Sequence, residues 1–383
     1  MRRENQQMRT MCSRSFAVAS LAIGALTLSA LQTQGADFTQ TNLVSNISTL
    51  GAKITDPQLV NPWGVAPSPT GPGPGLLSSN NGNGGAINPN GSATRYAVTN
   101  KTTVRKVINP QGLIAMPTTA AGPQGPTGTV NNTNRSSFPV LGGDGKSAQF
   151  IFANLNGTIS AWDTGPTAIV QATGAPGTRY TGLAINRAQT RLYAANHGLG
   201  RIDVFDSNFL AVSLPGTPFV DPLLPTGLVP FNVQQIDGKV YVTYALAGPD
   251  SVTSNAPPGA GAVAVFEEDG NFIKEVVVGS RLAAPWGITF APPSFGRFGF
   301  HLLVGNFSYL HSEINAFDPT TGELRGTIPI DTGDQQAGGL WAIDFGIGGN
   351  NGSPDVLYFS DGINGETHGL FGAIAADGAQ AAR

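Results

Sequence analysis

The sequence predicts an all-β fold, a six-bladed β-propeller, from three observations. A short motif, clearest as Pro-Trp-Gly at 62–64 and 285–287, recurs in degenerate form along the chain. Its copies lie about 50 to 64 residues apart, a spacing typical of propeller blades. Each copy is followed by short β-branched and aromatic runs that Gly, Asn and Asp bound, which indicates strands joined by tight turns. The six anchor positions, one for each expected blade, are Gly64, Gly128, Gly182, Asn232, Gly287 and Ala342.

The segment 191–206 (RLYAANHGLGRIDVFD) shows the plan of one repeat. Two apolar runs flank a turn rich in Asn and Gly, and the second run ends in an aromatic residue and an acid. Asn and Gly suit such turns because the turns need positive φ angles. One such sheet cannot bury both of its faces, so the sheets must stack around an axis. We expect four strands in each blade. The segments 149–163, 240–267 and 302–318 follow the same plan.

The first 36 residues have the pattern of a signal peptide. A basic start precedes an apolar run at 16–31, which is of signal-peptide length and short for a membrane span. Cleavage is expected near Gly35 or Ala36, and the alternative is an amphipathic start that is retained. The one cysteine, Cys12, lies in this segment, so the mature chain is expected to lack disulfides and thiolate metal sites. The basic residues are Arg2, Arg3, Arg9 and Arg14.

The remaining chain is interpreted as a single propeller domain at 37–378, followed by a short tail at 379–383. The segment 38–47 alternates like a strand. We expect it to close the last blade, which begins near Leu340, because such closure ties the two termini together and covers an exposed edge. Helical periodicity is almost absent after the signal, so no helix longer than two or three turns is expected.

Composition excludes a nucleic-acid partner. The full chain carries a net charge of −3, and removal of the predicted signal leaves 17 basic and 23 acidic residues, a net charge of −6. Binding of nucleic acid would need a basic patch. The 51 glycines and 28 prolines fit a turn-dense β protein. We expect a secreted monomer that does not contact a membrane once the signal is removed.

Six runs near the two ends of the predicted propeller are distinctive: 41–45 (TNLVS), 56–64 (DPQLVNPWG), 303–307 (LVGNF), 316–322 (AFDPTTG), 339–343 (GLWAI) and 366–372 (ETHGLFG). They resemble a family of secreted bacterial proteins of uncharacterised function. More broadly, the chain is similar to NHL-type and gluconolactonase-like six-bladed propellers. The resemblance implies an exported propeller and no known chemistry. Some members of the narrower family end in a sorting tail with a membrane span, which the end of this chain at 378–383 does not resemble.

A ligand site is expected at one rim of the central channel. The innermost strand of a blade begins on the face where the second strand ends, so residues at those positions share a rim. The tryptophans there either stack on a flat ligand or pack between blades. The asparagines either bind a ligand or hold turns, and the histidine is either a ligand contact or a polar loop residue. The predicted ligand-binding residues are Trp63, Asn154, Asn196, His197, Trp286, Asn306, Trp341 and Asp361.

Two short pairs, His311 with Glu313 and Glu366 with His368, form a second candidate site. Residues two apart on an extended chain point the same way, so each pair presents an imidazole and a carboxylate together. The four side chains could hold a divalent metal such as calcium, or supply a base with an orienting acid. The alternative is that each histidine bonds its own carboxylate and fixes a loop.

The sequence favours a secreted, non-catalytic propeller that binds a small or polymeric extracellular ligand, or serves as a scaffold. The alternative is a metal-dependent lactonase, hydrolase or lyase at the channel mouth. Motifs for serine hydrolases, zinc proteases, EF-hands and nucleotide-binding loops are missing from the sequence. Loops rich in Pro, Gly and Ser at 67–75, 109–125 and 247–261 are either solvated surface or part of a binding mouth.

Overall fold

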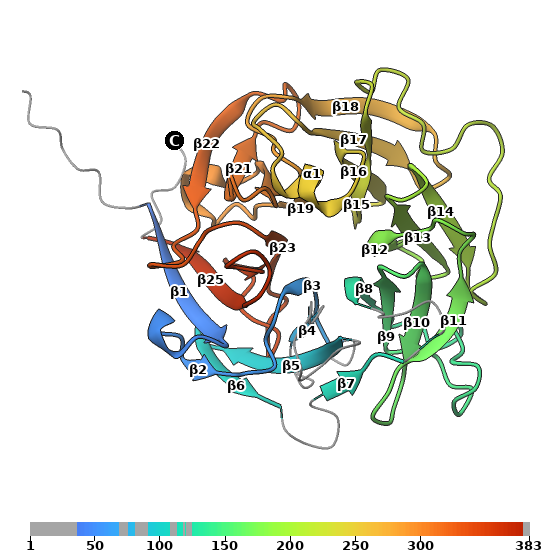
Figure 1. Ribbon diagram of the computed structural model, residues 1–383, viewed down its shortest axis with the longest axis horizontal. Coiled ribbons are helices and arrows are strands. Elements are labelled where there is room, and N and C mark those ends of the chain that lie inside the picture. The colour runs from blue at the N-terminus through green and yellow to red at the C-terminus, as the bar shows by residue number, and fades with distance from the viewer. Residues whose placement is uncertain are drawn as a thin grey trace, which may run out of the picture. The chain divides into compact units, whose positions relative to one another are not determined.

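The computed structural model describes residues 37–68, 76–80, 91–107, 113–117, 119 and 125–377. The predicted signal peptide at 1–36 and the predicted tail at 379–383 lie outside the described residues. The chain divides into two units, 1–35 and 36–383. In the second unit six small sheets stand around a central axis (Figure 1). The predicted all-β, six-bladed propeller is therefore confirmed.

The blades follow one another along the chain, each with its first strand innermost. Blade 1 holds β3 (Pro62–Ala66), β4 (Leu76–Asn80), β5 (Ser92–Thr99) and β6 (Thr103–Lys106), with β7 (Leu113–Ala115) also on β5. Blade 2 holds β8 (Pro126–Asn131), β9 (Phe150–Asn154), β10 (Thr158–Trp162) and β11 (Ile169–Thr173). Blade 3 holds β12 (Tyr180–Ile185), β13 (Arg191–Asn196) and β14 (Arg201–Asp206).

Blade 4 holds β15 (Leu228–Ile236), β16 (Lys239–Leu246), β17 (Ala262–Glu267) and β18 (Phe272–Val278). Blade 5 holds β19 (Pro285–Phe290), β20 (Leu302–Asn306), β21 (Glu313–Phe317) and β22 (Leu324–Pro329). Blade 6 holds β23 (Leu340–Phe345), β24 (Val356–Asp361), β25 (Leu370–Ala376), β1 (Phe38–Ser45) and β2 (Ile54–Thr55).

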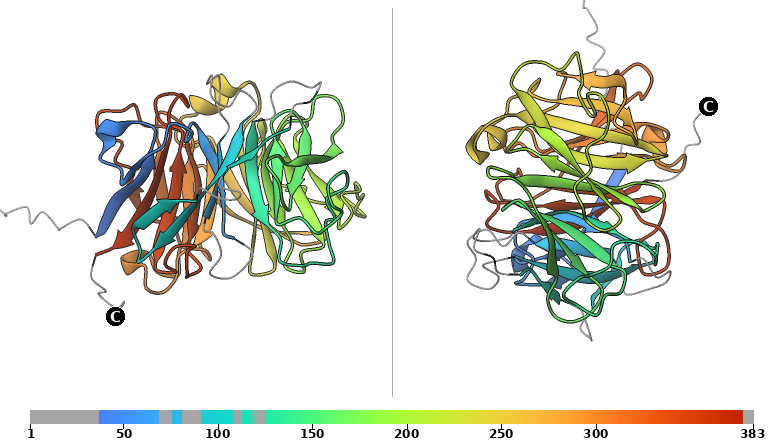
Figure 2. Two further views of the ribbon diagram at one scale, coloured as in Figure 1. Left: turned by 90° about the horizontal axis from the view of Figure 1, so that it is seen from below. Right: turned by 90° about the vertical axis from the view of Figure 1, so that its right-hand side faces the viewer.

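The N-terminal strand closes the last blade, as predicted. β1 pairs with β25 in antiparallel register from Phe38↔Ala376 to Ser45↔Leu370. Figure 2 shows this strand on the outside of blade 6. The Phe38 ring lies 5.3 Å from that of Phe298 in blade 5, so the closing strand is also fixed to the neighbouring blade.

Blade 3 differs from the expected four strands. Its sheet ends at β14, and the described residues after Asp206 form no further strand on it. Asp206 Oδ1 instead accepts the backbone N–H groups of Asn208 and Leu210 in a turn. The following segment is rich in proline, which lacks the N–H group that a strand ladder needs. These prolines are Pro215, Pro218, Pro222 and Pro225.

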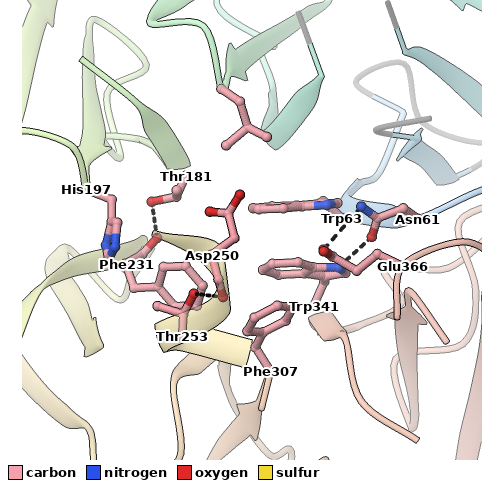
Figure 3. Close-up of a pocket in the computed structure, with 11 residues that line it drawn as sticks. Asn61, Trp63, Thr181, His197, Phe231, Asp250, Thr253, Phe307, Trp341 and Glu366 are labelled. Carbon is pink, nitrogen blue, oxygen red and sulfur yellow. Dashed lines mark hydrogen bonds between the residues drawn. The ribbon is translucent and has the colours of Figure 1, made fainter. Parts of the chain in front are cut away.

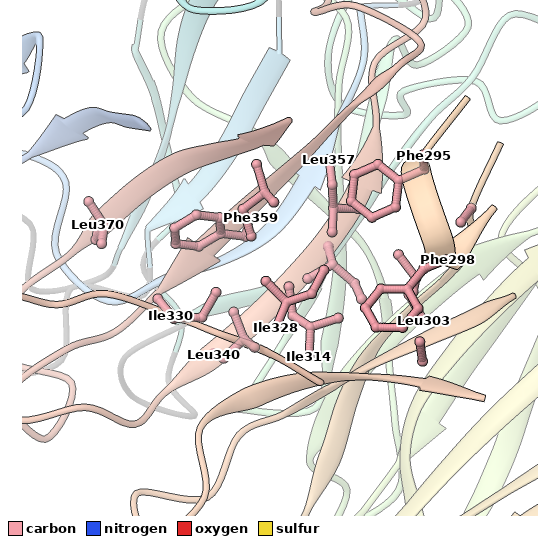
Figure 4. Packing of buried hydrophobic residues seen from close by; sticks show 14 of the residues in the cluster. Phe295, Phe298, Leu303, Ile314, Ile328, Ile330, Leu340, Leu357, Phe359 and Leu370 are labelled. Atoms are coloured by element: carbon pink, nitrogen blue, oxygen red, sulfur yellow. The ribbon is translucent and has the colours of Figure 1, made fainter. Parts of the chain in front are cut away.

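Apolar side chains fill the spaces between blades. Figure 4 shows the cluster between blades 5 and 6, where Leu303, Ile314 and Ile328 pack against Leu357 and Phe359. Each of these residues is at most 5% exposed. Burial of one such side chain contributes about 1.5–3 kcal/mol.

Helices are few and short among the described residues. α1 (Asp250–Ser254) is the longest described helix, and the 3₁₀ turns Ser48–Leu50 and Gly296–Phe298 have three residues each. This agrees with the expected lack of long helices in the described part of the chain. None of the described helices is long and apolar enough to cross a membrane.

The anchor glycines allow neighbouring innermost strands to touch. A Cβ atom on Gly64 would lie 2.5 Å from the carbonyl oxygen of Thr127. On Gly128 it would lie 2.2 Å from the backbone nitrogen of Leu183, and on Gly287 2.3 Å from the carbonyl oxygen of Trp341. Real Cβ contacts are never this short, so the repeated motif needs glycine for close approach between blades. We call the six anchor positions and these contacts the anchor collar.

We predict that Gly287→Ala destabilises the protein by about 3 kcal/mol or prevents its folding, because the clash is with backbone that cannot move aside. Urea unfolding followed by circular dichroism measures the change. Gly145→Ala is the control, since a Cβ there meets nothing within 4 Å although its φ is +74°. Equal stability loss in the two variants would contradict the role assigned to the collar.

Candidate functional site

The innermost strand of each blade is irregular at its anchor. The pairing of every innermost strand with its neighbour is interrupted at the anchor, for example between Pro62 and Val65 in β3 and between Leu340 and Ile343 in β23. Such β-bulges redirect side chains. The residue before each anchor lies in this irregular stretch. These six residues are Trp63, Thr127, Thr181, Phe231, Trp286 and Trp341.

Five aromatic side chains fill the channel as one cluster, which we call the aromatic plug: Trp63, Phe231, Trp286, Phe307 and Trp341. Trp341 stacks between Trp63, with ring centroids 3.4 Å apart, and Phe307, at 4.1 Å. Trp286 meets Trp341 edge to face at 5.7 Å. No member is more than 5% exposed. The three tryptophans thus pack between blades, and the alternative of an exposed aromatic rim does not describe them.

A cavity of about 60 Å³ lies over the plug at the mouth where the innermost strands begin (Figure 3). It is walled by the aromatic plug on one side and by polar side chains from loops and from α1 on the other. Trp63, Trp341 and His197, all predicted at this rim, line it. The described residues that line it are Asn61, Trp63, Leu155, Thr181, His197, Phe231, Asp250, Thr253, Phe307, Trp341 and Glu366.

Asn61 and Glu366 form a strained pair in the cavity wall. Asn61 has φ 47° and Glu366 has φ 65°, a left-handed region that disfavours side chains such as glutamate. Asn61 Nδ2 donates to Glu366 Oε1 at 3.2 Å, while Asn61 Oδ1 accepts from Trp341 Nε1 at 3.0 Å. The two side chains are therefore held in place by each other and by the plug.

The carboxyl group of Glu366 is poised to lose or gain a proton near neutral pH. Burial raises its pKa from 4.5 to about 7, and hydrogen bonds from Asn61 and Tyr309 only partly oppose this shift. Burial also raises the pKa of the Tyr309 hydroxyl, which faces the same carboxyl. A group with a pKa near the ambient pH can act as a general acid or as a neutral hydrogen-bond donor.

His197 supplies an acceptor on the other side of the cavity. Its Nδ1 lies 3.1 Å from the carbonyl oxygen of Pro230. Because a carbonyl only accepts, Nδ1 carries the proton and Nε2 is left with a free lone pair. Burial lowers the pKa of His197, which keeps the ring neutral.

The remaining polar groups make the cavity neutral to acidic. Asp250 begins α1 and pairs with Arg179, and the Thr253 hydroxyl donates to the Asp250 carbonyl oxygen at 3.0 Å. Trp63 Nε1 is buried and has no partner among the described residues. Among the described residues, no lysine or arginine lines the cavity. The arrangement offers a flat apolar surface, a neutral imidazole and a carboxyl group to a neutral or cationic ligand.

The predicted asparagines hold turns and do not line the cavity. Asn196 Oδ1 accepts the backbone N–H groups of Arg179 and Leu199, at 3.3 and 3.1 Å. Asn306 Oδ1 accepts the N–H of Ala283 at 3.0 Å. Asn154 Nδ2 donates to the carbonyl oxygen of Thr158 at 3.1 Å. All three are fully buried, so the turn-holding alternative describes their contacts.

Asp361 occupies the same position at the end of a second strand, β24, but has no such contact. It is fully buried, and neither carboxylate oxygen has a hydrogen-bond partner among the described residues. Burial raises its pKa well above the ordinary value. It lies close enough to Tyr309 to raise the pKa of that hydroxyl, and it is not among the residues that line the cavity.

The structure does not bring the four predicted metal ligands together. Glu313 is engaged by Arg281 through two hydrogen bonds, of 2.8 and 2.7 Å. His368 Nδ1 lies 3.0 Å from Asn46 Nδ2, and Glu366 faces the cavity. His311 has no contact with the other three. Among the described residues, no group of three or more His, Cys, Asp or Glu side chains could hold a metal ion.

Sequence reasoning missed several lining residues. Thr181 and Phe231 precede anchors, so the repeat contained the signal for them. Asp250 and Thr253 belong to the loop at 247–261, which composition left open between solvated surface and binding mouth. That loop forms α1 and reaches the cavity. Asn61 gave no signal of its own, because its contact with Glu366 joins residues 305 positions apart.

Two curated relatives of this chain are proteins of a virus. It is 29% identical over 350 residues to an uncharacterized protein of Acanthamoeba polyphaga mimivirus, covering 88% of this chain and 85% of the relative. A second uncharacterized protein of the same virus is 32% identical over 289 residues, which are 72% of this chain and 66% of that protein. No family model matches the chain. These relatives do not support the bacterial origin that the resemblance implied.

Solved propellers resemble the chain only distantly. Virginiamycin B lyase from Staphylococcus aureus has a TM-score of 0.48 and 12% identity, covering 88% of this chain and 98% of that one. A streptogramin B lyase structure has a TM-score of 0.49 and 12% identity, covering 89% and 97%. Similarity at this level does not carry an activity or a ligand over to this chain.

We predict that Glu366 makes the protein less stable as the pH rises. Its folded pKa of about 7 lies above the ordinary 4.5, so the folded state binds the proton more tightly between those values. The stability that this tighter proton binding contributes is fully present below pH 4.5 and is lost as the pH rises through 7. The free energy of unfolding should fall by on the order of 3 kcal/mol over this range. Urea unfolding from pH 4 to 8 measures it.

Glu366→Gln should remove this part of the pH dependence while it retains an acceptor for Asn61. The exposed Glu323→Gln serves as the control and should leave the wild-type slope in place. An unchanged slope in Glu366→Gln would show that the carboxyl is not protonated in the folded state.

Proposed function

We propose that this chain is an exported, extracytoplasmic β-propeller that binds a ligand in the cavity over the aromatic plug. The observation that carries the proposal is the strained Asn61–Glu366 pair beside the unpartnered Trp63 Nε1 at the channel mouth. Strain at buried polar residues is retained where function needs a fixed geometry.

The size of the cavity limits what enters it. A volume of about 60 Å³ is well below the roughly 300–1,000 Å³ of pockets that enclose a whole drug-sized ligand. Only an end group would fit, with the rest of the ligand outside the mouth. This supports a small molecule or the terminus of an extracellular polymer. Glu366 and Asp250, the latter paired with Arg179, bring carboxyl groups to the wall. No lysine or arginine is among the described lining residues, which favours a neutral or positively charged end group.

The export half of the proposal rests on the N-terminal pattern at 1–36. If it holds, expression in a bacterial host with an intact N-terminus should yield protein outside the cytoplasm that starts near Ala36. N-terminal sequencing of the fractionated protein measures this. Protein that stays cytoplasmic with its start intact would contradict export and would leave the binding proposal untouched.

We predict that single-ring probes bind in the order of their charge. Benzylamine and benzyl alcohol should quench the fluorescence of the three plug tryptophans at millimolar concentration, whereas benzoate should bind more weakly because of the acidic wall. Thr253→Phe should abolish the response by filling the cavity. Ser251→Phe, on the same helix but exposed and away from the lining, should retain it.

A response that survives in Thr253→Phe would place binding elsewhere. Failure of all three probes would contradict the end-group proposal itself.

The second candidate is a hydrolase or lyase, which the opposite pKa shifts of His197 and Glu366 favour. A neutral imidazole and a protonated carboxyl in one cavity are a base and an acid for proton transfer. The expected metal is not needed for this chemistry. Turnover of lactone or ester probes that is lost in His197→Asn, with benzylamine binding kept, would favour the enzyme over the binding protein.

A further inference from the structure

Three polar side chains on and beside blade 4 approach one another without hydrogen-bond partners: Asp221 in the segment before β15, Tyr244 on β16 and Glu275 on β18. Asp221 is 8% exposed and Tyr244 1%, while Glu275 is half-buried. Asp221 Oδ2, Glu275 Oε1 and the Tyr244 hydroxyl all lack a hydrogen-bond partner among the described residues. Buried polar atoms without partners are rare in folded proteins, and each needs an explanation.

The two carboxyl groups face each other closely. Glu275 lies within hydrogen-bonding range of Asp221, and the Tyr244 ring lies close enough to feel both charges. Neither carboxylate forms an ion pair with a described lysine or arginine. Burial and the neighbouring Asp221 raise the pKa of Glu275. Two like charges in a partly dry site repel each other unless a proton or a cation lies between them.

The local backbone directs these groups to one point. The pairing of β17 with β18 shifts beside Glu275, between Val263↔Val277 and Ala264↔Glu275, and such a bulge re-aims a side chain on an outer strand. Asp221 Oδ1 accepts the N–H of Leu223 at 2.9 Å, which fixes the carboxylate and leaves Oδ2 free. The segment that carries Asp221 is held on blade 4 by the Phe219 N–H, which donates to the Gly270 carbonyl oxygen at 2.8 Å.

We propose that Asp221 and Glu275 bind a hard divalent cation, calcium or magnesium, beside the Tyr244 hydroxyl. Carboxylate oxygens are the ligands that these ions prefer, and waters complete their coordination. The ion ties the proline-rich segment between β14 and β15, which replaces the fourth strand of blade 3, to the outer strand of blade 4. This site is separate from the channel mouth and from the four residues that the sequence suggested as metal ligands.

Thermal unfolding of the chelator-treated, purified protein tests the proposal. Addition of calcium chloride or magnesium chloride at millimolar concentration should raise the Tm by about 2–4 °C, and titration calorimetry should give one ion per chain. The larger effect identifies the preferred ion. Asp221→Asn retains the Leu223 contact and should lose the response, as should Glu275→Gln.

Comparison of the Tm of the wild type and of Asp221→Asn, with and without added ion, distinguishes a bound cation from a shared proton. Without added ion, Asp221→Asn should unfold at a higher temperature than the wild type, because one of the two facing charges is gone, and added calcium should reverse this order. Asp334→Asn, which removes an exposed carboxylate elsewhere, should respond to calcium like the wild type. A wild-type Tm unaffected by both ions, or a response retained in Asp221→Asn, would overturn the proposal and leave a carboxyl pair that shares one proton.

Discussion

The close approach of neighbouring innermost strands is the constraint on which the rest of this propeller depends. At Gly182 a Cβ would lie 2.1 Å from Asn232 Oδ1, and Asn232 Nδ2 in turn donates to the Trp286 carbonyl oxygen at 2.8 Å. The ring closes where Ser360 Oγ donates to the Trp63 carbonyl oxygen at 2.5 Å, joining blade 6 to blade 1. Hydrogen bonds and missing Cβ atoms thus set one narrow radius for the channel.

That radius explains the aromatic plug. Side chains that the bulges turn inward from different blades have little room, so Trp63 and Trp341 must stack face to face and Trp286 must meet them edge-on. The plug separates the cavity over it from the polar opening at the other end of the channel, where Gln234, Asn131 and Asp344 gather. The recurring Trp-Gly sequence therefore has two roles. Its glycine allows neighbouring blades to touch, and its tryptophan forms part of the aromatic plug beneath the cavity.

The sequence could predict the parts of the structure that repeat. Six anchors gave the number of blades, and the alternating segment at 38–47 gave the closing strand, because both depend on local pattern. The missing fourth strand of blade 3 could not be predicted in this way. The effect of the prolines there depends on whether the segment can still reach the edge of the sheet. The pairing of Glu313 with Arg281, which keeps Glu313 from a metal, joins loops 32 residues apart and has no local pattern.

The sequence could predict where the candidate site lies, but not which polar side chains form it. The rule that first strands begin where second strands end located the mouth, and His197 and Trp341 are there. The asparagines at the same level bond to the backbone of nearby turns: Asn196 and Asn306 accept N–H groups, and Asn154 donates to a carbonyl oxygen. Asp361 shows what happens when that position holds an acid: the carboxyl is buried, neither oxygen has a hydrogen-bond partner among the described residues, and burial raises its pKa well above the ordinary value. Asp361 also lies close enough to raise the pKa of the Tyr309 hydroxyl, which faces Glu366. Burial, rather than the net charge of the chain, therefore raises the pKa of both carboxyl groups.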